Sequence, residues 1–160
     1  MATDMFLQID GIKGESQDKA YKGQIDVQSW SWGMSNSGSA HTGGGQGAGK
    51  VNVQDLSFSH YIDKSTPDLM LACCTGKHIP KAVLTVRKAG GSPLDYLQIT
   101  MEDLIVTGLT TGGSTGDDRL TETVNLNFAK VKVQYKEQTP TGAVGDKPQM
   151  GWDIRSNSKL

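Results

Sequence analysis

Four stretches of the chain alternate apolar and polar residues, as β-strands do, but each shifts its phase midway. Between residues 23 and 33, Ile25 and Val27 share one face, and the apolar positions then move to Trp30 and Trp32. Because side chains alternate strictly along a strand, such a shift requires a β-bulge or a sharp bend. The same shift occurs at 51–58, 97–106 and 124–135. These strands are therefore predicted to curve and to serve two parts of one barrel or corner-turning sheet.

Two other stretches read as regular strands. Residues 5–9 form a short apolar run, and residues 80–88 place Ala82, Leu84 and Val86 on one side, as strands do. The chain is therefore predicted to be mainly β, and no linker or internal repeat divides it into more than one domain. A second explanation of the shifted strands stays open, in which another subunit covers their second halves.

Only the segment at 66–76, TPDLMLACCTG, has the features of a helix. Thr66 can cap the amides at its start, and Pro67 suits the first helical position. Gly76 can adopt the left-handed conformation that ends a helix. One short helix is thus predicted at about 66–75. By helical spacing, its buried face comprises Leu69, Ala72 and Cys73.

Charge and composition exclude several classes of function. The 16 Lys and Arg residues balance 17 Asp and Glu residues, and nucleic-acid binding needs a clustered basic excess. No apolar run approaches the roughly 20 residues of a membrane helix, so we expect no membrane insertion. The start of the chain, MATDMFLQID, lacks the basic and apolar regions of a secretion signal. We expect the protein to stay in the cytoplasm or to leave without signal cleavage.

The cysteines and histidines give no sign of a metal or redox site. Cys73 and Cys74 are adjacent and are the only cysteines, so no disulfide framework and no zinc site is expected. We expect both to pack as small apolar side chains. His41, His60 and His78 lie far apart and are interpreted as ordinary polar residues.

A glycine-rich segment at about 36–50 partly matches a phosphate-binding loop. Gly44, Gly49 and Lys50 fit the start of G-x-x-x-x-G-K-[ST], but Val51 stands where the magnesium-binding hydroxyl belongs. The residues that follow alternate as a strand, whereas a phosphate loop leads into a helix. A nucleotide site is therefore rejected. Two interpretations remain open, a loose hairpin loop and a loop that orders against a partner.

No set of polar residues suggests catalysis. Glu102 and Asp103 are adjacent on a predicted strand, so their carboxylates point to opposite faces. Ser29 and Ser31 alternate with Trp30 and Trp32, so the serines face outward if the tryptophans face the core. These serines are either simply exposed to solvent or part of a channel lining, where small neutral groups avoid sticking.

Several long strings in the chain resemble one known family. They are IDGIKGES at 9–16, SWSWGMSNSGS at 29–39, GGGQGAGKVNVQDLSF at 43–58, DKSTPDLMLACCTGKHIPKAVLTVRKAG at 63–90, LQITMEDLIVTGLTTGGSTGDDRLTETVNLNFAKVKVQY at 97–135 and GWDIR at 151–155. Together they cover essentially the whole chain. They resemble the haemolysin-coregulated proteins (Hcp) of bacterial type VI secretion.

The resemblance implies a fold and a role. The fold is a compact β-barrel of two curved antiparallel sheets with one short flanking helix. Members form hexameric rings that stack into an inner tube, within a contractile sheath and beneath a spike, and sheath contraction expels the tube from the cell. Small effector proteins travel in the lumen. The resemblance implies further contacts with the baseplate, and neither catalysis, a cofactor nor a metal.

The resemblance also assigns roles to residues. The loop that reaches an adjacent ring corresponds to Gly38, Ser39, His41, Gly43, Gly44, Gly45, Gly47, Gly49 and Lys50. Ser31 matches a lumen-facing position that contacts cargo. The departures are slight, namely Gln46 within the glycine run and the adjacent pair Cys73 and Cys74.

Overall fold

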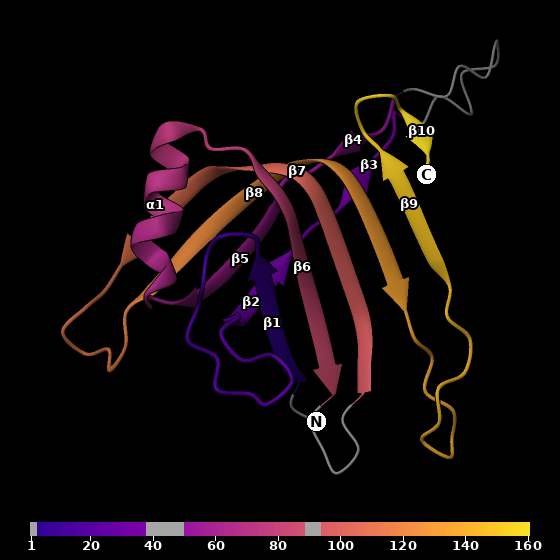
Figure 1. The fold of residues 1–160 in the computed structure, drawn as a ribbon, viewed down its shortest axis with the longest axis horizontal. Helices are drawn as coiled ribbons and strands as arrows, with labels where there is room; N and C mark the ends of the chain where they lie inside the picture. Colours follow the sequence, from indigo (N-terminus) through magenta and orange to yellow (C-terminus); the bar gives the residue numbers. More distant parts are fainter. Residues whose placement is uncertain (1–2, 38–49, 89–93) are drawn as a thin grey trace.

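The computed structural model describes residues 3–37, 50–88 and 94–160. This part of the chain forms ten strands and one helix (Figure 1). In chain order they are β1 (Thr3–Ile9), β2 (Ile25–Ser31), β3 (Met34–Ser35), β4 (Asn52–Val53), β5 (Leu56–Tyr61), α1 (Ser65–Thr75), β6 (Ile79–Lys88), β7 (Leu94–Gly112), β8 (Thr121–Tyr135), β9 (Gln149–Asp153) and β10 (Ser158–Lys159).

Six of these strands close into an antiparallel barrel. Their order is β8–β5–β2–β1–β6–β7, and β7 closes the barrel by pairing with β8. Strands β9 and β10 extend the sheet beyond β8, and β3 and β4 form a separate ribbon. The interior is apolar and includes Leu7, Ile25, Leu84, Ile99 and Leu126. The prediction of a mainly β barrel of curved antiparallel sheets with one short helix is confirmed.

In β7 and β2 the phase shifts of the sequence coincide with irregularities in the strands, whereas the shift predicted within one strand at 51–58 separates two strands, β4 and β5, of different sheets. Met101 and Leu104 of β7 are both fully buried, although a regular strand would place them on opposite faces. Asp103 between them has a φ of 53°, and the strand registers skip it together with Pro80 of β6 and Ala129 of β8. Pro80 has no N–H to donate at this point. The three strands therefore bend together along one line across the sheet. In β2, the predicted irregularity is a register shift between Val27 and Ser29.

Helix α1 is present as predicted, but its start was assigned wrongly. Thr66 does not cap the helix; the Asp63 carboxylate accepts the Ser65 N–H at 2.8 Å instead. Gly76 ends the helix with a φ of 64°, as predicted. Leu69 and Ala72 are buried.

The two cysteines of α1 differ in exposure. Cys73 packs against the core, whereas Cys74 is exposed. The prediction that both pack as small apolar side chains is therefore correct only for Cys73. The helix turns Cys74 to its outer side, three positions after Leu71, which is exposed as well.

A buried polar pair lies beneath α1. His60 on β5 is fully buried, and its Nε2 is 2.5 Å from Oε1 of Glu122 on β8. Thr66 of α1 donates its hydroxyl to the same carboxylate oxygen at 3.0 Å. His60 is therefore a buried polar residue whose partner lies 62 positions away in the sequence. The pair ties two strands and the helix together.

Glu122→Leu is expected to lower the free energy of unfolding by about 3–5 kcal/mol, because it removes the hydrogen-bond partner of the buried His60 Nε2. The double variant His60→Leu/Glu122→Leu should lose less than the sum of the two single variants. Urea unfolding at fixed protein concentration measures both. The exposed Glu137→Leu serves as a control and should change stability by less than about 0.5 kcal/mol. A Glu122→Leu variant as stable as this control contradicts the role of the pair.

Candidate functional site

The outer face of β2 and β5 carries serines in register. Ser29 lies opposite Ser59, and Ser31 lies opposite Ser57. The hydroxyl oxygens of Ser29 and Ser59 are 2.5 Å apart. Ser29 and Ser31 are exposed, while Trp30 and Trp32 pack against the core. The predicted orientation of these alternating residues is confirmed.

Small uncharged residues continue in register across β8 and β7. Ser57 and Ser59 lie opposite Asn125 and Thr123 of β8, and these two lie opposite Gly108 and Thr110 of β7. Since Val124 and Leu126 point into the core, the residues that alternate with them face outward. We call this surface the neutral face; it comprises Ser29, Ser31, Ser57, Ser59, Gly108, Thr110, Thr123 and Asn125.

Charged groups lie at the borders of the neutral face. At one end, the Asp55 carboxylate accepts hydrogen bonds from Thr107 at 2.6 Å and from Asn127 at 2.8 Å. At the other end, the guanidinium of Arg119 lies 3.8 Å from the ring centroid of Tyr61. The middle of the face therefore offers hydroxyl and amide groups without a charge.

The neutral face ends in a free strand edge on either side. Strand β1 pairs with β2 only at Ile25 and Asp26, so residues 27–31 pair with β5 alone. Residues 105–112 of β7 pair with β8 alone, because the pairing with β6 stops at Leu104. Within the described ranges, no other strand pairs with either edge. Such edges have unpaired backbone N–H and C=O groups that readily bind another strand.

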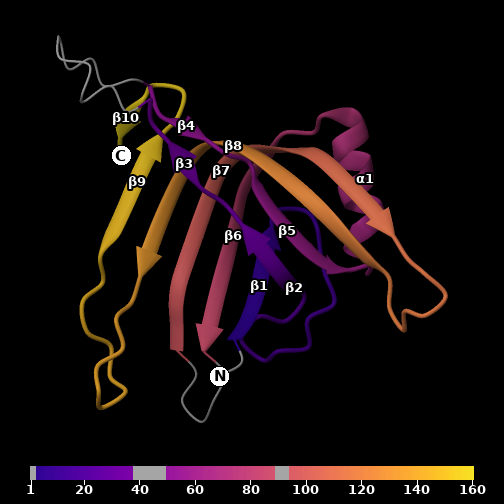
Figure 2. The ribbon, with the colours of Figure 1, turned by 180° about the vertical axis from the view of Figure 1, so that it is seen from behind.

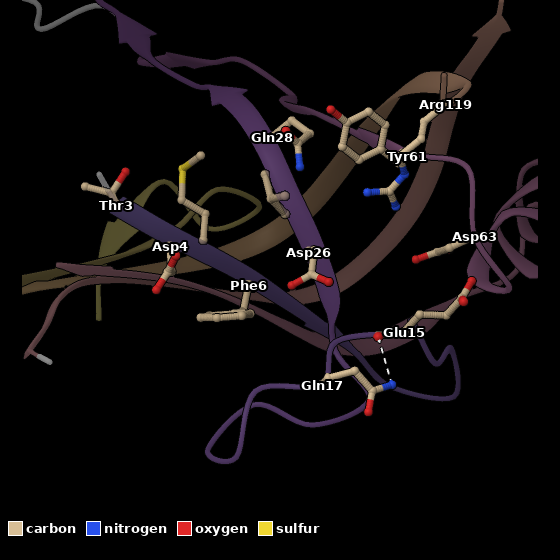
Figure 3. Close-up of a pocket in the computed structure, with 12 residues that line it drawn as sticks. Thr3, Asp4, Phe6, Glu15, Gln17, Asp26, Gln28, Tyr61, Asp63 and Arg119 are labelled. Carbon is tan, nitrogen blue, oxygen red and sulfur yellow. Dashed lines mark hydrogen bonds between the residues drawn. The ribbon is translucent and has the colours of Figure 1, made fainter. Parts of the chain in front are cut away.

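A pocket opens where β1 and β2 separate, next to the free edge of β2 (Figure 3). Its volume is about 560 Å³. The apolar side chains that line it are Met5, Phe6 and Val27, and the charged ones are Asp4, Glu15, Asp26, Asp63 and Arg119. Burial raises the pKa of Asp26. Sequence patterns gave no sign of this pocket, because its residues come from five separate segments.

Arg87 of β6 holds one wall of this region in place. Its guanidinium pairs with Asp18 at 2.6 Å and Asp4 at 3.0 Å and lies over the rings of Phe6 and Tyr21. The hydrogen bonds from Arg87 hold the pKa of Asp18 below its usual range. The segment between β1 and β2 is thereby fixed to the barrel.

Comparison with known proteins identifies the family. The family model described as "Type VI secretion system effector, Hcp" matches residues 6–135. Protein hcp1 of Pseudomonas aeruginosa is 60% identical over 159 residues, which is 98% of each chain. The chain belongs to the Hcp family. This family consists of structural proteins of type VI secretion and is not a family of enzymes.

Solved Hcp structures agree with the fold described above. Hcp1 from Salmonella typhimurium has a TM-score of 0.82 at 40% identity, with 100% of both chains covered. A type VI secretion system effector from Yersinia pestis has a TM-score of 0.77 at 34% identity, covering 94% of this chain and 100% of the other. Within the described part of this Hcp chain, no helix is long and apolar enough to cross a membrane.

The remaining candidate residues are only partly placed by the structure. Residues 38–49, with all the glycines assigned to ring contact, lie outside the described residues. Lys50 is exposed and is the first residue of the described range 50–88. It is followed by strands β4 and β5, so the helix that a phosphate loop needs is not there. In Figure 2, β3 and β4 lie toward the end of the molecule that carries β9 and β10.

The adjacent carboxylates of Glu102 and Asp103 have different neighbours. Asp103 lies at the bend of β7, with an oxygen 3.2 Å from Nε2 of His78. Glu102 instead pairs in the regular ladder, opposite Lys81 and Lys130. Among the described residues, no three His, Cys, Asp or Glu side chains gather as a metal site.

The pair of Asp18 and Arg87 predicts a stability that depends on acid pH. Because the pKa of Asp18 is lowered by folding, the stabilisation is complete above about pH 4 and disappears as the pH falls through the lowered pKa. Asp18→Asn should therefore be less stable than the wild type at neutral pH, and the difference should shrink in acid. Urea unfolding from about pH 7 to about pH 2.5 measures this. The exposed Asp118→Asn is the control, and a difference that stays constant into acid would contradict the assignment.

Proposed function

We propose that this protein is the structural subunit of the inner tube of a type VI secretion system. It assembles into hexameric rings, which stack into a tube inside the contractile sheath. The observation that carries the proposal is the neutral face with a free strand edge on either side. Membership of the Hcp family supports the same role.

The strand directions fit closure of a ring. Along β2–β5–β8–β7 each strand is antiparallel to the next, so β2 and β7 run in opposite directions. Pairing β2 of one copy with β7 of the next therefore continues the antiparallel sheet without interruption. Because the two edges differ, the contact is head to tail, and repeating it around an axis closes a ring when the rotation between copies divides the circle evenly. The pairing also removes both exposed edges.

In such a ring the neutral faces of all copies form the lining of the channel. Small hydroxyl and amide groups hold cargo without strong charge attraction, which allows cargo to be loaded and released. Ser31 lies on β2, next to the subunit boundary of this lining. We assign it to contact with small effector proteins in the lumen.

Other contacts follow from the same role. The loop from Gly38 to Lys50 reaches the adjacent ring, where its glycines allow a close approach of two backbones. The outer surface of the tube contacts sheath proteins, and its ends contact the spike and the baseplate. The protein is present in the bacterial cytoplasm before firing and leaves the cell on sheath contraction, without signal cleavage.

The ring predicts the mass of the purified protein. Light scattering should give about six times the chain mass of 17.1 kDa, and negative-stain images should show rings with an open centre. Pairing of all twelve free edges of six copies favours the closed ring over shorter assemblies, because only closure leaves no edge exposed. A mass near 17.1 kDa at high protein concentration would contradict the proposal.

Ser31→Gln is expected to leave rings intact and to reduce the amount of effector retained with them. The longer side chain enters the channel without adding a charge, so it disturbs cargo contact rather than folding. Co-purification of a cognate effector with the rings measures the effect. Ser158→Gln on β10 is the matched control, since Ser158 is exposed on a strand outside the neutral face. Normal cargo retention by Ser31→Gln would argue against a lumen role.

A further inference from the structure

We propose that helix α1 of one copy docks into the pocket between β1 and β2 of the next copy. This contact rests on the proposed ring and specifies its subunit interface outside the strand pairing. Three features of the structure support this contact: the outer side of α1, the positions of helix and pocket beside the two free edges, and the chemistry of the pocket.

The outer side of α1 is apolar. Leu71 is 63% exposed and Met70 is 38% exposed, and Cys74 lies on the same side. The opposite side of the helix already packs into the core through Leu69 and Ala72. A helix that is apolar on both sides is typical of a helix buried on both sides. The described part of the chain covers only one of them.

The helix and the pocket lie beside the edges that meet in the ring. Helix α1 packs against β7, the strand whose residues 105–112 have a free edge. The pocket is lined by Asp26, Val27 and Gln28 of β2 itself, at the free edge of that strand. When β7 of one copy joins β2 of the next, α1 and the pocket approach each other. A smaller apolar hollow lined by Met34, Val53 and Trp152 lies beside neither edge.

The chemistry of the pocket suits this occupant. Met5 offers apolar contact, with the nearly buried Phe6 and Val27 beneath it. The pocket volume of about 560 Å³ is enough for several side chains. Asp4 is paired with Arg87, and Glu15 accepts the Lys64 backbone N–H. Asp26, in contrast, has no ion pair with a Lys or Arg of the described chain.

A cation just after the end of α1 complements the Asp26 carboxylate. Lys77 is exposed directly after the helix end at Gly76, on the turn that follows Cys74. Since burial raises the pKa of Asp26, a lysine from the next copy would favour its charged form. The occupant is therefore a second copy of this chain, with Leu71 and Met70 in the pocket and Lys77 near Asp26.

Disulfide trapping tests the contact directly. Gln28→Cys in a Cys73→Ala background leaves the native Cys74 as its only partner. Mild oxidation should give covalent ladders up to hexamers on a non-reducing gel. Removing Cys74 should abolish the ladder, and Ser158→Cys in place of Gln28→Cys should give none, since β10 lies far from the pocket in the sheet order.

Substitution of Leu71 tests the same contact without cross-linking. Leu71→Asp should weaken ring assembly at least about tenfold, because it places a carboxylate against an acidic pocket. Leu71→Lys should weaken assembly less, because its charge is opposite. Val144→Asp is the matched control, being 43% exposed in the C-terminal region. Circular dichroism of each variant should match the wild type, since Leu71 lies outside the core.

The outcomes separate this proposal from the proposed function. If the wild type forms rings but Leu71→Asp assembles normally and no ladder appears, the docking of α1 is wrong while the tube role stands. If the wild type stays monomeric at high concentration, the tube role fails and the docking proposal fails with it. If Leu71→Asp and Leu71→Lys weaken assembly equally, the acidic pocket is not the receptor.

Discussion

The long pairing of β7 with β8 is the constraint on which the rest of the structure depends. These strands have 19 and 15 residues, whereas β1, β2 and β5 have six or seven. One half of the pair meets β6 and β9, and the other half meets β5. The barrel closes because the pair bends between the two halves, at Asp103 and Ala129. Because β6 stops at the bend, the second half of β7 keeps one edge free.

The sequence predicted the elements governed by neighbouring residues. The phase shift between Met101 and Leu104 predicted the bend. The alternation of serines with Trp30 and Trp32 predicted the outer face of β2, and Gly76 predicted the helix end. Each depends on backbone geometry over a few positions. Contacts between distant segments were not predictable in the same way. The pairing of His60 with Glu122 and the pocket around Asp26 depend on the strand order, which no local pattern encodes.

Charged side chains are unevenly distributed over the barrel. The pocket and the Arg87 cluster place carboxylates and a guanidinium around β1 and β6. The neutral face excludes charge from the middle of β2, β5, β8 and β7. A surface that only meets solvent gains solubility from charged side chains, so solvent exposure alone does not account for a face without them. A surface that must release what it holds is better served by weak, uncharged contacts.

Two features of the single chain support the proposed contact with a second copy for the same physical reason. An unpaired strand edge leaves backbone groups without hydrogen bonds to protein, and an exposed apolar helix side leaves hydrocarbon in water. Both occur on the β7 side of the barrel, at residues 105–112 and at Leu71. On the β2 side, a matching edge adjoins a pocket lined by Met5 and by Asp26, a carboxylate without an ion pair to a described Lys or Arg. In the proposed ring, one repeated contact satisfies the edge, the helix and the pocket together.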